Sequence, residues 1–172
     1  MAISILRYIL SMILLAGFQV FVLNNLNMSG FFNPQIFILF ILLLPVNTEI
    51  WLCLLAGFVS GAILDGLAVS YGIYAFCGTA LGYFRYFYIK FSLDKEVIER
   101  GMAPNIKNMS LEWHLTYLLI CSILYHWLAF TIEAFRFNNM LQISLKAVVS
   151  GVIATVLMAL TGFLFSRKTT NV

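Results

Sequence analysis

Long apolar runs separated by short polar segments dominate the chain. The runs cover about residues 3–23, 34–46, 49–68, 71–91, 111–135 and 140–165. A bilayer core about 30 Å thick is crossed by a helix of about 20 apolar residues, so most of these runs are long enough to span a membrane. The pattern predicts an all-α integral membrane protein: a single domain over residues 1–172, built as a bundle of six transmembrane helices.

The stretch from Pro34 to Ala68 is too long for one span. As a straight helix it would measure about 50 Å at about 1.5 Å per residue. Pro45 and the polar residues that follow it, up to Glu49, interrupt the apolar run. Because proline is favoured in the first turn of a helix, Pro34 marks the start of the second helix. We therefore expect structural turns at Pro34 and Pro45, with a short second helix between them.

Composition supports a membrane protein and narrows its chemistry. Hydrophobic residues make up 62% of the chain and charged residues 10%, whereas soluble domains are about half apolar and a quarter charged. The net charge of +3 is small and the basic residues lie at helix ends, so nucleic-acid binding is not indicated. Cys53, Cys77 and Cys121 lie singly in apolar runs without a metal-site spacing. We expect no metal and no cofactor.

The distribution of Lys and Arg predicts the orientation in the membrane. With six spans, Arg7, the loop from Lys90 to Lys107 and the Arg167-Lys168 tail lie on one side, and little beyond Arg136 lies on the other. Positive residues favour the cytoplasmic side, so both termini are expected to be cytoplasmic. The first apolar run has no cleavage signature, and we expect it to be a retained helix.

Aromatic and basic residues gather at the end of the fourth predicted span. Tyr83, Tyr86 and Tyr88 lie near Arg85 and Lys90. Tyrosines concentrate at membrane interfaces, and long basic side chains extend from the hydrocarbon to the headgroups. The cluster is therefore expected to anchor this end at the cytoplasmic interface.

A charged loop follows the fourth predicted span. Residues 92–111 form the one strongly polar stretch of the sequence. Gly101 and Pro104 would end any short surface helix within it. We therefore expect any helix in this stretch to be short and to lie at the surface.

Gly57, Gly61 and Asp65 lie four residues apart and therefore on one face of the third predicted span. Small residues at this spacing let another helix approach closely. In one interpretation this face seats a partner helix, and Asp65 accepts hydrogen bonds across the contact. In the other, Asp65 is a solvated helix end at the membrane edge. The residues leave both interpretations open.

Two further stripes of small residues are predicted to pack within the bundle. Gly78 and Gly82 repeat the four-residue spacing in the fourth span. The last span carries a comparable stripe at Gly151, Thr155, Ala159 and Gly162. Glycine is frequent in membrane helices and ordinary packing uses such faces, so contacts within the chain are the preferred interpretation.

The sequence offers few groups for catalysis or ligand binding. His126 and Glu133 are seven residues apart on one face of the fifth span, which suits a proton relay, a cation site or a packed structural histidine. The structural histidine is the preferred interpretation. Together with Asn24 and Asn25, these two residues are also the candidates for a polar ligand pocket. No metalloprotease, phosphate-loop or nucleophile-elbow motif occurs, and we expect no enzyme activity.

The third and fourth spans resemble a known family. The run Gly57-Phe58-Val59-Ser60-Gly61-Ala62-Ile63-Leu64-Asp65, followed by Ser70-Tyr71-Gly72 and a long apolar helix, is similar to the core of the rod shape-determining protein MreD family. Asn33-Pro34 and Leu43-Leu44-Pro45 resemble the second helix of that family. The resemblance extends over about residues 33–85, and the last third of the chain carries no recognisable family motif.

The resemblance implies a role and a location. It implies a non-enzymatic scaffold of the cell-elongation complex in the bacterial inner membrane, which binds MreC and helps to position peptidoglycan synthesis. MreB, RodA and the elongation transpeptidase are the wider partners it implies. The family fold is thought to resemble substrate-binding subunits of energy-coupling-factor transporters. Gly57, Gly61, Asp65, Gly72, Gly78 and Gly82 are then the expected packing residues.

Two rival functions follow from the same sequence. A vitamin-type transporter subunit would need a polar pocket, and the few convergent polar groups weigh against one. A lipid-modifying enzyme would need paired acidic or histidine clusters, which the sequence lacks. Lipid or precursor binding without chemistry stays open.

Overall fold

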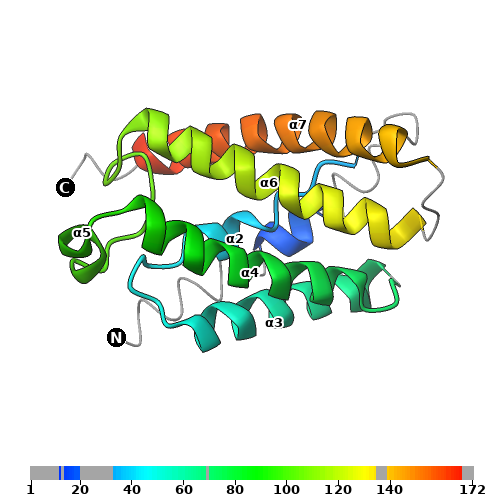
Figure 1. Cartoon of the computed structure of the whole chain (residues 1–172), viewed down its shortest axis with the longest axis horizontal. Coiled ribbons are helices and arrows are strands. Elements are labelled where there is room, and N and C mark those ends of the chain that lie inside the picture. The colour runs from blue at the N-terminus through cyan, green and yellow to red at the C-terminus, as the bar shows by residue number, and fades with distance from the viewer. Residues whose placement is uncertain (1–11, 13, 20–32, 69, 135–138, 168–172) are drawn as a thin grey trace.

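The computed structural model describes residues 12, 14–19, 33–68, 70–134 and 139–167. The helices are α2 (Leu39–Leu42), α3 (Ile50–Ala68), α4 (Ile73–Ser92), α5 (Lys95–Glu99), α6 (Leu111–Ala134) and α7 (Met140–Arg167). Helices α3 and α4 lie side by side, as do α6 and α7, while α4 also contacts α6 (Figure 1). The short α2 lies in the middle of this arrangement. No strand occurs among the described residues.

Four of the predicted spans correspond to long helices. The spans predicted at 49–68, 71–91, 111–135 and 140–165 agree closely with α3, α4, α6 and α7. In the described part of the chain, three helices are long and apolar enough to cross a membrane: Ile50–Ala68, Leu111–Ala134 and Met140–Phe163. Helix α4 is equally long but less apolar, because it contains Arg85 and Lys90. The described part of the chain is therefore all-helical, with three candidate membrane spans.

The full count of six spans stays a prediction. Residues 14–18 are helical, which agrees with the first predicted span, but most of 3–23 lies outside the described residues. Both ends of the chain also lie outside the described residues, and the cytoplasmic position of the termini stays a prediction.

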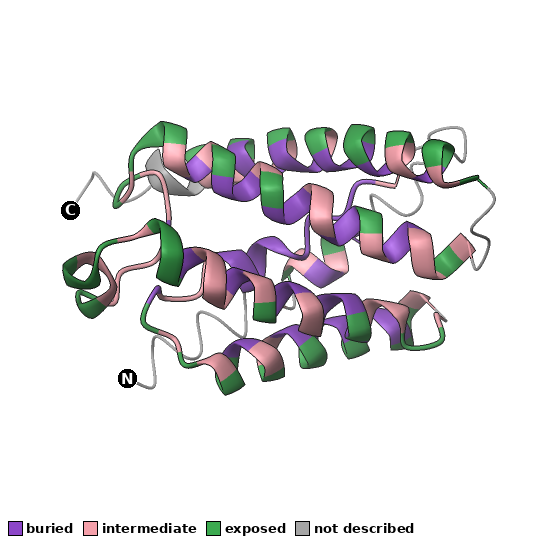
Figure 2. Ribbon diagram, in the orientation of Figure 1, coloured by how far each residue is buried: buried purple, intermediate pink, exposed green. Residues whose placement is uncertain are grey.

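The second predicted span, 34–46, is wrong as a helix. Only Leu39–Leu42 is α-helical, and the residues on both sides of it follow an irregular path. Pro34 and Pro45 lack the backbone N–H that a helix uses, and each disfavours helical geometry in the residue before it. Residues 34–42 are nevertheless all buried (Figure 2). We call residues 33–46 the buried segment.

The buried segment forms the centre of the core. Ile36, Ile38, Ile41 and Leu42 are almost completely buried. They belong to one cluster with residues from the surrounding helices, among them Leu64, Leu81, Tyr117, Leu118, Tyr125 and Met158. The outer faces of α3 and α7 expose large apolar side chains, as expected of helices that contact lipid.

The charged loop contains one short surface helix, as predicted. Helix α5 ends before Gly101, whose φ of 62° lies in the left-handed region that glycine adopts freely. The loop is joined to the buried segment, because the Val46 N–H donates to the Met102 carbonyl oxygen over 3.0 Å. Gly101 also lies against the Asn47 side chain. The loop therefore covers the point where the buried segment leaves the core.

Candidate functional site

Helices α3 and α4 touch backbone to backbone through glycines. A Cβ atom added at Gly57 would overlap the carbonyl oxygen of Gly78, and one added at Gly78 would overlap that of Gly57. A Cβ at Gly61 would overlap the Tyr74 carbonyl, and one at Gly82 the Cys53 carbonyl. Only glycine permits this approach. The glycine pair of α3, Gly57 and Gly61, and that of α4, Gly78 and Gly82, thus form the two sides of one helix–helix contact.

This contact changes the interpretation of the Gly57, Gly61 and Asp65 face. The helix that it seats is α4 of the same chain, and Gly57 and Gly61 are buried beneath it. A second protein therefore cannot use these glycines unless α3 and α4 separate.

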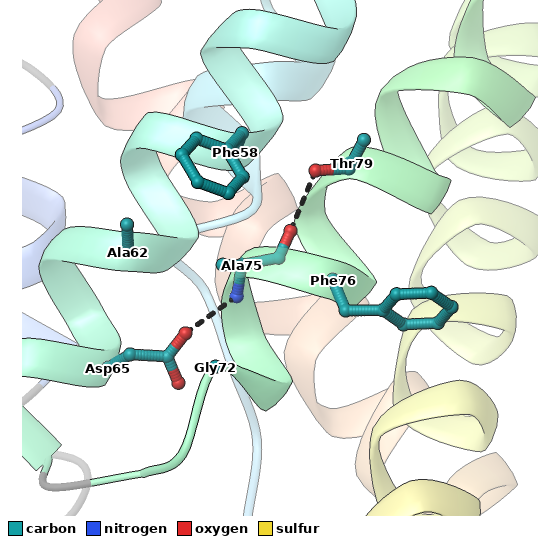
Figure 3. Close-up of a pocket in the computed structure, with 7 residues that line it drawn as sticks. All are labelled: Phe58, Ala62, Asp65, Gly72, Ala75, Phe76 and Thr79. Atoms are coloured by element: carbon teal, nitrogen blue, oxygen red, sulfur yellow. Dashed lines mark hydrogen bonds between the residues drawn. The ribbon is translucent and has the colours of Figure 1, made fainter.

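Asp65 caps the beginning of α4. Its Oδ1 accepts hydrogen bonds from the Ser70 hydroxyl at 2.6 Å and the Tyr74 N–H at 3.1 Å, and its Oδ2 accepts one from the Ala75 N–H at 2.8 Å. The first N–H groups of a helix have no partner within it, and a carboxylate there is favoured by the helix dipole. The side chain is only 8% exposed, so the solvated-end interpretation is wrong. Figure 3 shows the Asp65–Ala75 bond.

Gly72 makes the turn that brings α4 back to Asp65. Its φ is 83°, and it is the residue immediately before α4. Residues with a Cβ are strained in this conformation, whereas glycine adopts it freely. Gly72 therefore acts through its backbone and is a turn residue rather than a packing residue, since nothing lies within 4 Å of the position its Cβ would occupy.

The first half of the buried segment is held by side chains from other parts of the chain. The Ile36 N–H donates to Gln19 Oε1 at 2.8 Å, and Gln19 Nε2 donates to the Pro34 carbonyl at 3.2 Å. The Gln35 N–H donates to His126 Nε2 at 3.1 Å, and Tyr125 donates its hydroxyl hydrogen to Gln35 Oε1 at 3.0 Å. These bonds replace those that a helix would have made.

His126 is fully used by the chain itself. Its Nε2 accepts from Gln35, so its Nδ1 carries the hydrogen and donates to the Ser122 carbonyl at 2.7 Å. His126 is completely buried, whereas Glu133 is exposed. The structure does not bring these two residues together as a relay or pocket. Asn24 and Asn25, the other two candidates for a polar pocket, lie outside the described residues.

Arg85 holds the second half of the buried segment, which the sequence did not indicate. The predicted extension of Arg85 to the interface is wrong, because its side chain is 1% exposed. It donates to the carbonyl oxygens of Leu44 and Pro45 and to Cys53 Sγ, the last two at 3.1 and 3.2 Å. Tyr117 adds a bond of 3.0 Å to the Leu42 carbonyl. Its neighbours in sequence include tyrosines that were predicted to lie at the membrane interface, so no local signal marked Arg85 as buried.

The stripe on α7 packs within the chain, on α6. Ser122 donates to the Gly151 carbonyl at 3.1 Å, and a Cβ at Gly151 would crowd Ile123. Thr155 and Ala159 are also buried. This agrees with the preferred interpretation of the stripe.

A surface hollow lies beside Asp65, between α3 and α4. Its volume is about 460 Å³. It is lined by Phe58, Ala62, Asp65, Gly72, Ala75, Phe76 and Thr79, and Figure 3 shows these side chains. We call it the α3–α4 groove. In the described part of the chain, no three His, Cys, Asp or Glu residues are grouped so that they could hold a metal ion.

Comparison of the chain with protein-family models, curated proteins and solved structures found no match.

Proposed function

We propose that this protein is a non-enzymatic scaffold of the bacterial cell-elongation complex, similar to MreD, that binds MreC in the inner membrane. One observation supports the proposal most. Five residues of the family resemblance contribute to a single structural unit, the α3–α4 pair: Gly57, Gly61, Asp65, Ser70 and Gly72. A motif whose parts serve helix packing suits a protein that works by holding others in place.

The contact with MreC is assigned to α7. Its outward face exposes apolar residues along the length of the helix: Leu141, Leu145, Val148, Val149, Val152, Val156, Leu160 and Phe163. From Leu141 to Phe163 this face extends about 33 Å at about 1.5 Å per residue, which matches a bilayer core. Branched valines lose little side-chain freedom on packing, so the face suits a single membrane-spanning helix along its whole length.

Co-purification with MreC from detergent tests this assignment. Val149→Trp places a large side chain on the α7 face, and Val59→Trp makes the same change on the outer face of α3. The two valines are equally exposed, at 39% each. We expect Val149→Trp to lose MreC and Val59→Trp to retain it. Equal retention by both variants would exclude the α7 face, and failure of the wild-type protein to retain MreC would exclude the function.

The wider complex and the orientation belong to the same proposal. MreB, RodA and the elongation transpeptidase would be reached through MreC or from the cytoplasmic side, where the charged loop and both termini are predicted to lie. An alkaline phosphatase fusion, active only outside the cytoplasm, is expected to work after Asn139 and to fail after Asn105. The reverse result would overturn the orientation.

A transporter substrate-binding subunit is the second candidate. The buried segment favours it, because interrupted helices at mid-depth are typical of transporter sites. Against it, the polar groups of His126 and Gln35 are engaged within the chain. A vitamin-sized ligand retained through purification and identified by mass spectrometry would favour the transporter over the scaffold.

A further inference from the structure

The α3–α4 groove extends along α3 from near the end of this candidate membrane span toward its middle. Helix α3 ends at Ala68, and Asp65 lies three residues before that end. Phe58, at the other end of the groove, lies seven residues before Asp65, or about 10 Å at about 1.5 Å per residue. Just beyond Phe58, the Gly57–Gly78 contact closes the space between the helices. The groove is therefore about a third as long as a bilayer core and is shorter than one leaflet.

The walls and floor of the groove are apolar. Phe58 and Phe76 are 54% and 59% exposed and stand on the two helices that form it. Ala62 and Ala75 line it with small side chains. The Thr79 hydroxyl donates to the Ala75 carbonyl at 2.8 Å and so adds no free polar group. This lining suits a hydrocarbon chain.

The Asp65 carboxylate supplies negative charge at the edge of the groove. Its three hydrogen bonds come from uncharged donors, which are the Ser70 hydroxyl and the Tyr74 and Ala75 N–H groups. The helix dipole of α4 offsets only about half an elementary charge, so a cation at the carboxylate would be favoured further. A carboxylate has about four acceptor positions. Three of these positions are occupied, two on Oδ1 and one on Oδ2, so Oδ2 can accept one more hydrogen bond.

We propose that the α3–α4 groove binds one phospholipid whose headgroup carries a primary ammonium. The ammonium donates to Asp65 Oδ2, and one acyl chain lies between Phe58 and Phe76. The length of the groove favours a lipid over a partner helix, because a spanning helix would need a face about three times as long. The proposal does not rest on the scaffold function.

Native mass spectrometry of the detergent-purified protein tests this binding. The protein is incubated with equal amounts of phosphatidylethanolamine, phosphatidylglycerol and phosphatidylcholine that carry the same acyl chains. Phosphatidylglycerol lacks the cation, and the ammonium of phosphatidylcholine has no N–H to donate. We expect phosphatidylethanolamine to be retained about tenfold more than either, which corresponds to about 1.4 kcal/mol.

Two variants assign the binding to the groove. Asp65→Asn keeps an oxygen acceptor for the α4 cap but removes the charge, and should abolish the preference for phosphatidylethanolamine. Ala62→Phe fills the groove without altering Asp65 and should abolish retention. Ala62 is exposed, so the larger side chain does not disturb the core. Val59→Phe, on the same helix but outside the groove lining, is the matched control and should bind as wild type.

Three results would overturn the proposal. The first is equal retention of the three lipids by the wild-type protein. The second is an unchanged preference in Asp65→Asn with helix content preserved by circular dichroism. The third is a single-span protein that co-purifies with the wild type and is released by Ala62→Phe, which would make a helix the occupant. Val149→Trp, the variant designed to lose MreC, should retain the lipid, so the two proposals can fail separately.

Discussion

The α3–α4 pair and the buried segment belong to the same protein core, but their backbone polar groups are satisfied in different ways. In the pair, the helices satisfy their own backbones, glycines allow contact, and one carboxylate caps α4. In the buried segment, side chains from distant positions such as Gln19, Arg85 and His126 provide the hydrogen bonds. The pair is thus specified by residues close in sequence, and the segment by residues far from it.

This difference has a consequence for stability. A backbone that is irregular within a membrane is tolerated only where protein groups satisfy it. The pair should therefore be sensitive to the size of its residues, and the segment to the loss of particular donors and acceptors. The following substitutions test this contrast, with stability measured by SDS titration of the detergent-solubilised protein, followed by circular dichroism.

Gly57→Ala should have the largest effect. The new methyl group would overlap the Gly78 carbonyl, which is backbone and cannot rotate away. Overpacking of this kind costs about 3 kcal/mol, more than the gain of about 1 kcal/mol in helix propensity. Gly66→Ala is the matched control on the same helix, because nothing lies within 4 Å of its added Cβ. It should be neutral or stabilising, and equal behaviour of the two variants would contradict the close contact.

Arg85→Met should have the next largest effect. Methionine keeps most of the length but leaves the Leu44 carbonyl without the donor that Arg85 provides, whereas Pro45 keeps its bonds from Thr48. An orphaned buried carbonyl costs about 2 kcal/mol. Lys90→Met, on the exposed side of the same helix, should change the free energy of unfolding by less than about 0.5 kcal/mol. If Lys90→Met lost as much stability as Arg85→Met, the removal of a positive charge would explain the effect, rather than the loss of the Arg85 hydrogen bonds.

His126→Leu tests the other end of the buried segment. It removes the acceptor of the Gln35 N–H, at a cost of about 1.5 kcal/mol. Glu133→Gln should have almost no effect, since Glu133 is exposed. If Glu133→Gln and His126→Leu instead reduced the same transport or binding activity without loss of stability, the two residues would form a functional pair.

Much of the fold could be predicted from the sequence, because it is encoded locally. Apolar runs gave α3, α4, α6 and α7 to within a few residues, and the four-residue spacing gave the glycine faces. The partner of those faces was not predictable, since a stripe of small residues fits a helix of the same chain or of another protein equally well. The burial of Arg85 was hidden for a related reason, because its acceptors lie about 40 residues away in sequence.

The buried segment was the least predictable element. Its apolar run of 34–46 has the composition of a short helix, and the prolines at its ends are compatible with a helix between them. The irregular path depends on Gln19, Gln35 and His126, which meet only in the folded chain. Period and composition cannot indicate such a long-range set of hydrogen bonds.

Gly72→Ala should have the smallest effect and separates backbone strain from packing. Nothing lies within 4 Å of the position of the new Cβ, so the cost arises only from the positive φ of 83° and should be about 1 kcal/mol. Gly72→Asn should cost less than Gly72→Ala, because asparagine tolerates the left-handed conformation better. This order is the opposite of that expected from size, since asparagine is the larger side chain. If alanine were instead the better tolerated of the two, crowding rather than backbone conformation would limit which residues the turn accepts. In that case Asp65 would not depend on Gly72 for its position at the start of α4.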